Sequence, residues 1–280
     1  MPCSPRTALI LEPRSHKRRM KRVLSEGVEI AFEDTGHGEP ALVLIHGAFG
    51  NRSQFTPLVD HLAERHRVIT LDLRGHGESG VPRDGFRIAD FAQDVLAVCR
   101  EARVERAVLC GHSMAGAVAL TAAALDPGLA AGVVLLDTVL FPDPLQRHAR
   151  ETLVTALEGP HWLEALRGFI GARMFSPFDP PELKPRIIEE LAAVPPFLPA
   201  PLMRDFFSVD VSHELSAGRY PLLFIYSRVP ADLARLRELR PDVLIGSVVG
   251  SGHYIPLVVP EQLSAMLDRF LAILPLAVQA

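Results

Sequence analysis

A serine with small neighbours lies between an apolar, strand-like segment and a run of small residues typical of a helix. The segment C-G-H-S-M-A-G occupies residues 110–116. A serine at a tight strand-to-helix turn needs small neighbours, because larger side chains would collide with the strand and the helix. Gly111 and Ala115 supply them, although the strict pattern G-x-S-x-G has glycine at the position of Ala115, and Gly116 comes one residue later. Ser113 is therefore the candidate nucleophile.

A serine hydroxyl is a weak nucleophile and needs a base, for which histidine is the usual side chain. Of the 11 histidines, His253 lies in a glycine-flanked loop, G-S-G-H-Y-I-P, between the last strand-like and the last helix-like segment. His112 is adjacent to Ser113, but at such a turn it is expected to point away. With His253 as base, the rate should rise with pH through the neutral region.

Two aspartates compete for the carboxylate that would orient this histidine. Asp137 interrupts the apolar segment A-G-V-V-L-L-D-T-V-L-F, and Asp232 comes late in I-Y-S-R-V-P-A-D-L. The carboxyl ends of adjacent parallel strands face one crevice, so Asp137 can reach a histidine in the last loop. Asp232 also suits a helix N-cap after Pro230. The pattern favours Asp137 and leaves Asp232 open.

The elements that must position these residues alternate between strands and helices. Short apolar runs spaced by amphipathic ones indicate a parallel sheet covered on both faces, here an eight-stranded, doubly wound α/β sheet. Strands are expected at 41–46, 67–73, 107–111, 132–137, 221–226 and 242–249, with a hairpin around Glu26-Gly27 before them. Helices are expected at 53–65, 88–102, 114–125, near 232–239 and at 260–273.

The alternation stops between 138 and 219, which we expect to be an inserted helical lid. This segment holds 11 of the 24 prolines and 7 of the 14 phenylalanines, with the single tryptophan, Trp162. Proline at this density predicts short helices, near 143–158, 161–174, 181–193 and 200–209. The predicted domains are therefore a disordered basic arm at 1–22, a core formed by 23–137 and 220–280, and the lid.

Together with two further motifs, H-G-A-F at 46–49 and D-L-R-G-H-G-E-S at 72–79, the serine turn resembles the α/β-hydrolase superfamily. The resemblance implies that the backbone N–H groups of Ala48 and Met114 bind the oxyanion and that His46 is structural. Most members carry their acid after the seventh strand, where this chain has Val229 and Pro230. Some branches, including one subgroup of haloalkane dehalogenases and zearalenone-type lactonases, similarly carry it after strand six.

Composition argues against several other classes of function. A formal net charge of −4 gives no electrostatic signature for nucleic acid, and no apolar run approaches the roughly 18 residues that span a bilayer. Three scattered cysteines indicate neither a disulfide framework nor a zinc site and fit a reducing cytoplasm. Gly75, Gly77 and Gly80 match G-x-G-x-x-G, but the chain continues as loop where a dinucleotide-binding motif opens a helix. We expect no cofactor and no metal.

The sequence thus predicts a serine hydrolase that cleaves an ester or lactone of a small apolar molecule through an acyl-enzyme. C–C bond hydrolysis on the same three residues is a rival, and so is a ligand-binding or signalling protein with little turnover. We expect no nucleic-acid or membrane partner, and a homodimer stays open.

Overall fold

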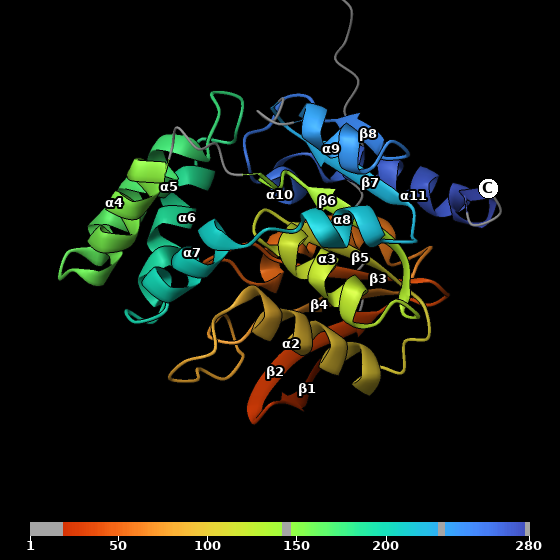
Figure 1. The fold of residues 1–280 in the computed structure, drawn as a ribbon, viewed down its shortest axis with the longest axis horizontal. Helices are drawn as coiled ribbons and strands as arrows, with labels where there is room; N and C mark the ends of the chain where they lie inside the picture. Colours follow the sequence, from red (N-terminus) through yellow and green to blue (C-terminus); the bar gives the residue numbers. More distant parts are fainter. Residues whose placement is uncertain (1–18, 142–146, 229–232, 278–280) are drawn as a thin grey trace, which may run out of the picture.

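A mostly parallel sheet forms the centre of the computed structural model, which describes residues 19–141, 147–228 and 233–277 (Figure 1). Within these residues the sheet has eight strands in the order β1-β2-β4-β3-β5-β6-β7-β8. The strands are β1 (Met20–Ser25), β2 (Val28–Thr35), β3 (Ala41–Ile45), β4 (Val68–Leu71), β5 (Ala107–His112), β6 (Ala130–Leu136), β7 (Leu222–Tyr226) and β8 (Leu244–Ser247). The β1–β2 and β2–β4 pairs are antiparallel, and all other pairs are parallel. The predicted fold class is confirmed.

The antiparallel edge begins earlier than expected. Strand β1 starts at Met20, so residues 20–22, which were assigned to the disordered arm, belong to the sheet. Their basic side chains have acidic partners, because Lys21 pairs with Asp34 at 3.0 Å and Arg22 with Glu29 at 2.8 Å. The expected hairpin turn has positive φ at both central residues, Glu26 (48°) and Gly27 (84°), as a two-residue turn between twisted strands requires. Residues 1–18 of the expected arm lie outside the described residues.

Two layers of helices cover the sheet, because the strands alternate their side chains between its faces. In β3, Leu42 and Leu44 belong to one apolar cluster, and Val43 and Ile45 belong to the other. The first cluster includes helices α1 (Thr56–Leu62), α10 (Ile255–Val258) and α11 (Pro260–Ala277). The second includes α2 (Ile88–Glu101), α3 (Ala115–Leu125) and α9 (Leu233–Leu239). Burial on both faces explains why the central strands are almost wholly apolar.

Helices follow β6 in place of the next strand, as the proline-rich segment predicts. They are α4 (Arg147–Glu158), α5 (Trp162–Arg173), α6 (Leu183–Glu190), the 3-10 turn η3 (Leu191–Ala193) and α7 (Pro199–Ser208). Figure 1 shows α4 to α7 grouped beside the core, which fits a lid. A further helix that the sequence did not predict, α8 (Ser212–Ala217), packs instead against α3 and α9 of the core. No helix in the described part of the chain is long and apolar enough to cross a membrane.

Candidate active site

Ser113 lies at a strained turn between β5 and α3. Its φ of 57° is in the left-handed region, which costs energy for a residue with a Cβ atom. A Cβ atom at Gly111 would lie 2.0 Å from the Ala115 carbonyl oxygen, so only glycine fits there. At Gly116 it would lie 2.3 Å from Thr138 Oγ1. The second small position of the motif is thus fixed by the end of β6, and Ala115 is tolerated beside it.

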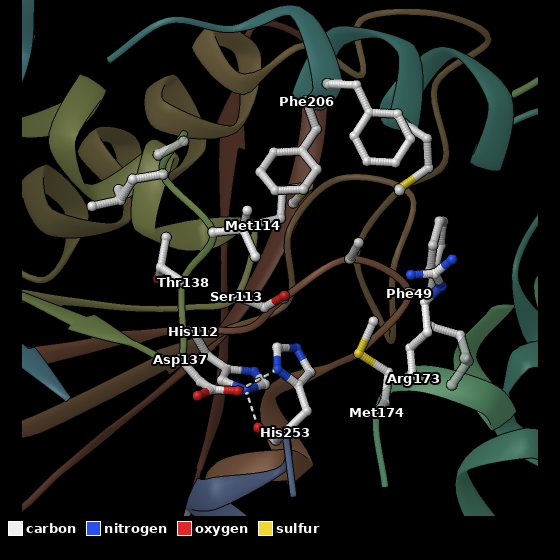
Figure 2. Close-up of a pocket in the computed structure, with 18 of the residues that line it drawn as sticks. Phe49, His112, Ser113, Met114, Asp137, Thr138, Arg173, Met174, Phe206 and His253 are labelled. Carbon is white, nitrogen blue, oxygen red and sulfur yellow. Dashed lines mark hydrogen bonds and ion pairs between the residues drawn. The ribbon is translucent and has the colours of Figure 1, made fainter. Parts of the chain in front are cut away.

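Asp137 and His253 are brought together at the carboxyl end of the sheet. Their side chains meet at 2.7 Å between Oδ2 and Nδ1 (Figure 2). The other carboxylate oxygen, Oδ1, accepts hydrogen bonds from the Ser227 backbone N–H at 2.7 Å and from its hydroxyl at 3.0 Å. Burial by itself would raise the pKa of the Asp137 carboxyl, but the hydrogen bond with His253 and those from Ser227 outweigh it and hold this pKa below its ordinary value. The carboxylate is therefore ionised at neutral pH. Asp232 lies outside the described residues.

The loop that carries His253 is held by three further contacts. The His253 backbone N–H donates to the Met174 carbonyl at 2.9 Å, and its own carbonyl accepts from His112 Nε2 at 2.8 Å. The N–H of Gly252 donates to Asp179 Oδ1 at 2.7 Å. Met174 and Asp179 lie in the loop between α5 and α6, so the predicted lid contributes directly to the position of the histidine. The contacts of Met174, Asp179 and His112 with this loop were not predictable from local sequence motifs.

The expected oxyanion donors lie beside the serine. Gly47 precedes Ala48, and a Cβ atom there would lie 2.9 Å from Ser113 Cβ, so glycine allows this close approach. Among the described residues, neither the Ala48 N–H nor the Met114 N–H forms a hydrogen bond, and both residues line the same cavity as Ser113. The next N–H, that of Phe49, donates to His76 Nε2 at 3.2 Å. Ala48 and Met114 therefore retain the free donors that an oxyanion needs.

Two buried histidines form hydrogen bonds with the backbone of this loop. His46 Nδ1 donates to the Gly47 carbonyl at 2.8 Å while Nε2 accepts from the Leu73 N–H at 3.0 Å. His76 donates to the Arg74 carbonyl at 2.9 Å and accepts from Phe49. Burial lowers the pKa of His46 to about 4 and that of His76 to about 3, so both are neutral near pH 7. Each neutral ring uses one nitrogen as a donor and the other as an acceptor, so both histidines hold neighbouring backbone segments in place.

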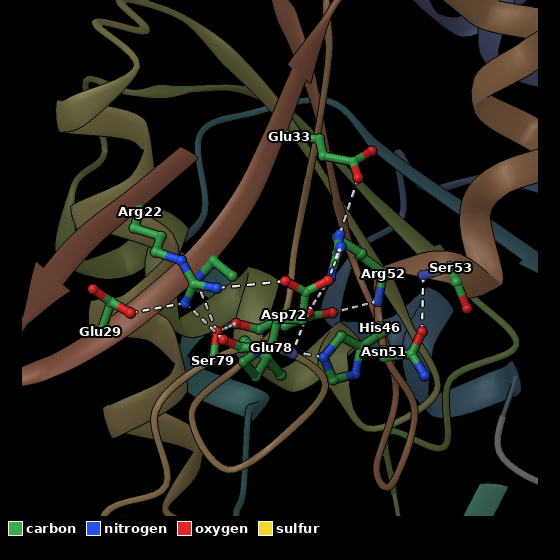
Figure 3. Close-up of polar contacts among 12 residues, drawn as sticks. Arg22, Glu29, Glu33, His46, Asn51, Arg52, Ser53, Asp72, Glu78 and Ser79 are labelled. Carbon is green, nitrogen blue, oxygen red and sulfur yellow. Dashed lines mark hydrogen bonds and ion pairs between the residues drawn. The ribbon is translucent and has the colours of Figure 1, made fainter. Parts of the chain in front are cut away.

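Next to these histidines, a buried ion-pair network fixes the loop after β4 (Figure 3). The Asp72 carboxylate is fully buried and accepts from the backbone N–H groups of Arg52 at 2.7 Å and Glu78 at 2.9 Å. The Arg52 guanidinium pairs with the same carboxylate. Arg74, likewise, pairs with buried Asp94 at 2.7 Å. The glycine-rich stretch is thus a structural turn, and α2 begins only at Ile88.

A cavity of about 530 Å³ opens between the lid and the end of the sheet, and Ser113, Asp137 and His253 all line it. Figure 2 shows the His253 ring between Asp137 and Ser113. Within the described residues the Ser113 hydroxyl has no hydrogen-bond partner, as is common for a nucleophile before substrate binds. The lid supplies Phe169, Phe206 and Phe207 to the wall, whereas Trp162 is partly buried and does not line the cavity.

A serine at a strained turn after a central strand, with a histidine–carboxylate pair at the same sheet edge, defines a hydrolase of the α/β fold. A family model described as the alpha/beta hydrolase fold matches residues 40–175. This match and the order of the strands identify the fold as that of the α/β hydrolases.

Relatives and solved structures agree with this assignment. The chain is 28% identical to a 2-(acetamidomethylene)succinate hydrolase of Mesorhizobium japonicum, over 86% of this chain and 91% of that protein. It superposes on a thermophilic esterase from Thermogutta terrifontis with a TM-score of 0.80 and 24% identity, over 91% and 99% of the two chains. A structure described as an N-acyl homoserine lactone degrading enzyme gives a TM-score of 0.77 and 22% identity, over 89% and 100%. At these identities the two structures establish the shared fold.

Proposed function

We propose that this hydrolase cleaves a carboxylic ester or lactone of a largely apolar small molecule through an acyl-enzyme on Ser113. The observation that carries the proposal is the 2.7 Å contact between Asp137 and His253 in the cavity that Ser113 lines. It supplies an oriented base, because Nδ1 donates to the carboxylate and leaves Nε2 to accept the serine proton. The esterase and the lactone-degrading enzyme among the similar structures support the same reaction class.

The reaction would run in two steps, acylation of Ser113 and hydrolysis of the acyl-enzyme. The Ser113 oxygen attacks the carbonyl carbon, and its proton passes to His253 Nε2. The oxyanion that forms accepts hydrogen bonds from the backbone N–H groups of Ala48 and Met114. The C–O bond to the alcohol then breaks, and the alcohol leaves with the proton from His253. Water adds to the acyl-enzyme, giving its proton to His253, and the acid is released as Ser113 regains its proton.

The composition of the cavity wall supports an apolar substrate body. Most of the lining side chains are aliphatic or aromatic, including the three lid phenylalanines. Burial of such a body against them contributes about 25 cal/mol for each Å² of apolar surface removed from water. The opening lies between lid and core, where α/β proteins of this kind bind their ligands.

A second reaction on the same residues is favoured by one comparison. The Mesorhizobium japonicum relative is named for the hydrolysis of a succinate derivative rather than of an ester, which makes a bond other than an ester the second candidate. Turnover of 2-(acetamidomethylene)succinate, measured beside 4-nitrophenyl esters and lactones, tests this second reaction.

Covalent labelling tests the proposed nucleophile. A fluorophosphonate should add once to the protein, with the adduct on the peptide that contains Ser113. Ser113→Ala should abolish labelling and lower kcat/KM for 4-nitrophenyl esters by roughly 10³-fold or more, because the covalent route is lost. Ser208→Ala, at an exposed serine of α7, is the matched control and should label fully. Labelling that persists in Ser113→Ala, or a folded protein that does not react, would contradict the proposal.

A further inference from the structure

Several arginines line the catalytic cavity. Among the described residues its wall includes Arg150, Arg173 and Arg228, and one carboxylate, that of Asp137. The Asp137 carboxylate is fully engaged by His253 and Ser227. A guanidinium at the wall of an apolar cavity, with no described carboxylate paired to it, can bind a carboxylate that a ligand brings.

Arg228 has a structural task. Its Nη2 donates to the carbonyl groups of Arg173 at 3.2 Å and Phe175 at 3.3 Å. These bonds tie the segment after β7 to the end of α5. Arg228 therefore fixes the place of Arg173 and has less donor capacity left for a ligand.

Arg173 is better placed to bind an anion. It is exposed at the end of α5, its guanidinium lies 5.5 Å from the centre of the Phe169 ring, and no described carboxylate forms an ion pair with it. Arg150 lies similarly over Phe207 at 5.3 Å. Both rings line the cavity, so the two guanidinium groups are held by aromatic faces at its wall.

The position of Arg173 is also linked to the catalytic base. The residue after it, Met174, accepts the backbone N–H of His253 at 2.9 Å. Figure 2 shows Arg173 on the side of Phe49 and Met174, across the cavity from Asp137 and Thr138. A substrate held at Arg173 would therefore extend across the cavity past Ser113 instead of lying along one wall.

We infer that the substrate carries a carboxylate at the end remote from the scissile bond, and that Arg173 binds it. This inference rests on the proposed function and narrows its substrate to esters or lactones of acidic apolar molecules. The guanidinium fork matches a carboxylate in a bidentate geometry, which aligns the substrate as well as attracting it. The apolar chain between the two ends would lie against the lid phenylalanines.

Paired esters of equal length test the inference by turnover. The mono-4-nitrophenyl esters of glutarate, adipate and suberate are compared with 4-nitrophenyl pentanoate, hexanoate and octanoate. For at least one length, kcat/KM of the acidic ester should exceed that of the neutral ester by about tenfold, the effect of a charge-assisted contact at a partly exposed site. In Arg173→Gln this ratio should fall towards one through KM, and Arg173→Lys should give an intermediate ratio.

A matched control separates this effect from a loss of positive charge on the lid. Arg186→Gln removes an exposed arginine of α6 that pairs with Glu190 at 3.5 Å and does not line the cavity. The ratio should stay at its wild-type value in this variant. Equal ratios in the wild type and Arg173→Gln would overturn the inference.

Binding to an inactive variant distinguishes this failure from failure of the proposed function. Calorimetry with monomethyl adipate on Ser113→Ala should give binding that Arg173→Gln weakens about tenfold. If no ester is turned over but this difference is found, the carboxylate site stands and the proposed reaction fails. If esters are turned over without a charge preference and binding is unaffected, the reaction stands and the carboxylate site is rejected.

Discussion

Asp137 shows why a carboxylate interrupts an apolar strand. It follows β6 with a φ of 47°, a left-handed conformation that aspartate tolerates better than most residues. The strand ladder continues through its N–H, which donates to the Ile225 carbonyl at 2.7 Å. The side chain is thereby turned towards His253 and Ser227, which together satisfy both oxygens. The cost of burying this charge is offset by those partners.

At this residue we predict that Asp137→Asn loses kcat by about 10³- to 10⁴-fold. An amide cannot stabilise the charged histidine and can select the wrong tautomer. The measurement is kcat on a 4-nitrophenyl ester, with circular dichroism to establish folding. Asp232→Asn is the matched control and should stay near wild type. The opposite pair of results would assign the acid to Asp232.

At the scale of elements, the loop between α5 and α6 joins the predicted lid to the loop of the proposed catalytic base, His253. Asp179 accepts the N–H of Gly252 at 2.7 Å through one oxygen and that of Ser176 at 2.8 Å through the other. A Cβ atom at Gly252 would lie 2.6 Å from this carboxylate, so the two loops are in direct contact. The predicted lid therefore helps to hold the loop that carries His253.

We expect Asp179→Ala to impair positioning of His253. Loss of two hydrogen bonds to a carboxylate should lower kcat about tenfold with a smaller change in KM, and should slow fluorophosphonate labelling of Ser113 to a similar extent. Asp205→Ala is the matched control, because Asp205 joins the lid helix α7 to the core through the Ile88 N–H at 2.7 Å, away from His253. It should lower thermal stability comparably and leave the labelling rate unchanged. Equal labelling rates in wild type and Asp179→Ala would refute the positioning role.

The elements were predictable to different degrees, for physical reasons. Strands such as β3 and β5 are buried on both faces, so their composition alone identifies them. The contact between Asp179 and Gly252 joins residues 73 positions apart, and S-P-F-D-P-P predicts only a turn. The role of Ser227 had a usable signal, since it follows β7 directly and β7 neighbours β6 in the sheet. Helix α8 was missed because six residues carry little periodicity.

At the scale of the whole molecule, we expect three buried histidines to make the stability of the fold depend on pH. They are His46 and His76, which hydrogen-bond to the backbone of Gly47 and Phe49, and His112, which precedes Ser113. Burial lowers the pKa of His112 to about 3, assisted by the nearby charge of His253, as burial lowers those of the other two. The ordinary value is 6.5, so the unfolded chain takes up protons at these residues before the folded protein does.

The free energy of unfolding should therefore have its full value above about pH 6.5. It should fall steadily at lower pH, since the unfolded state then binds more protons than the folded state. At pH 5.5 each histidine should lower the free energy of unfolding by about 1.4 kcal/mol, and the three together should lower it by about 4 kcal/mol. Urea unfolding followed by Trp162 fluorescence at pH 7.5 and 5.5 measures this difference.

His76→Gln should be less stable than the wild type at pH 7.5, yet its stability should lose about a third of the dependence on pH. His37→Gln, at an exposed histidine, should retain all of it. Equal stability at the two pH values would mean that the three histidines titrate in the folded protein as they do in the unfolded chain.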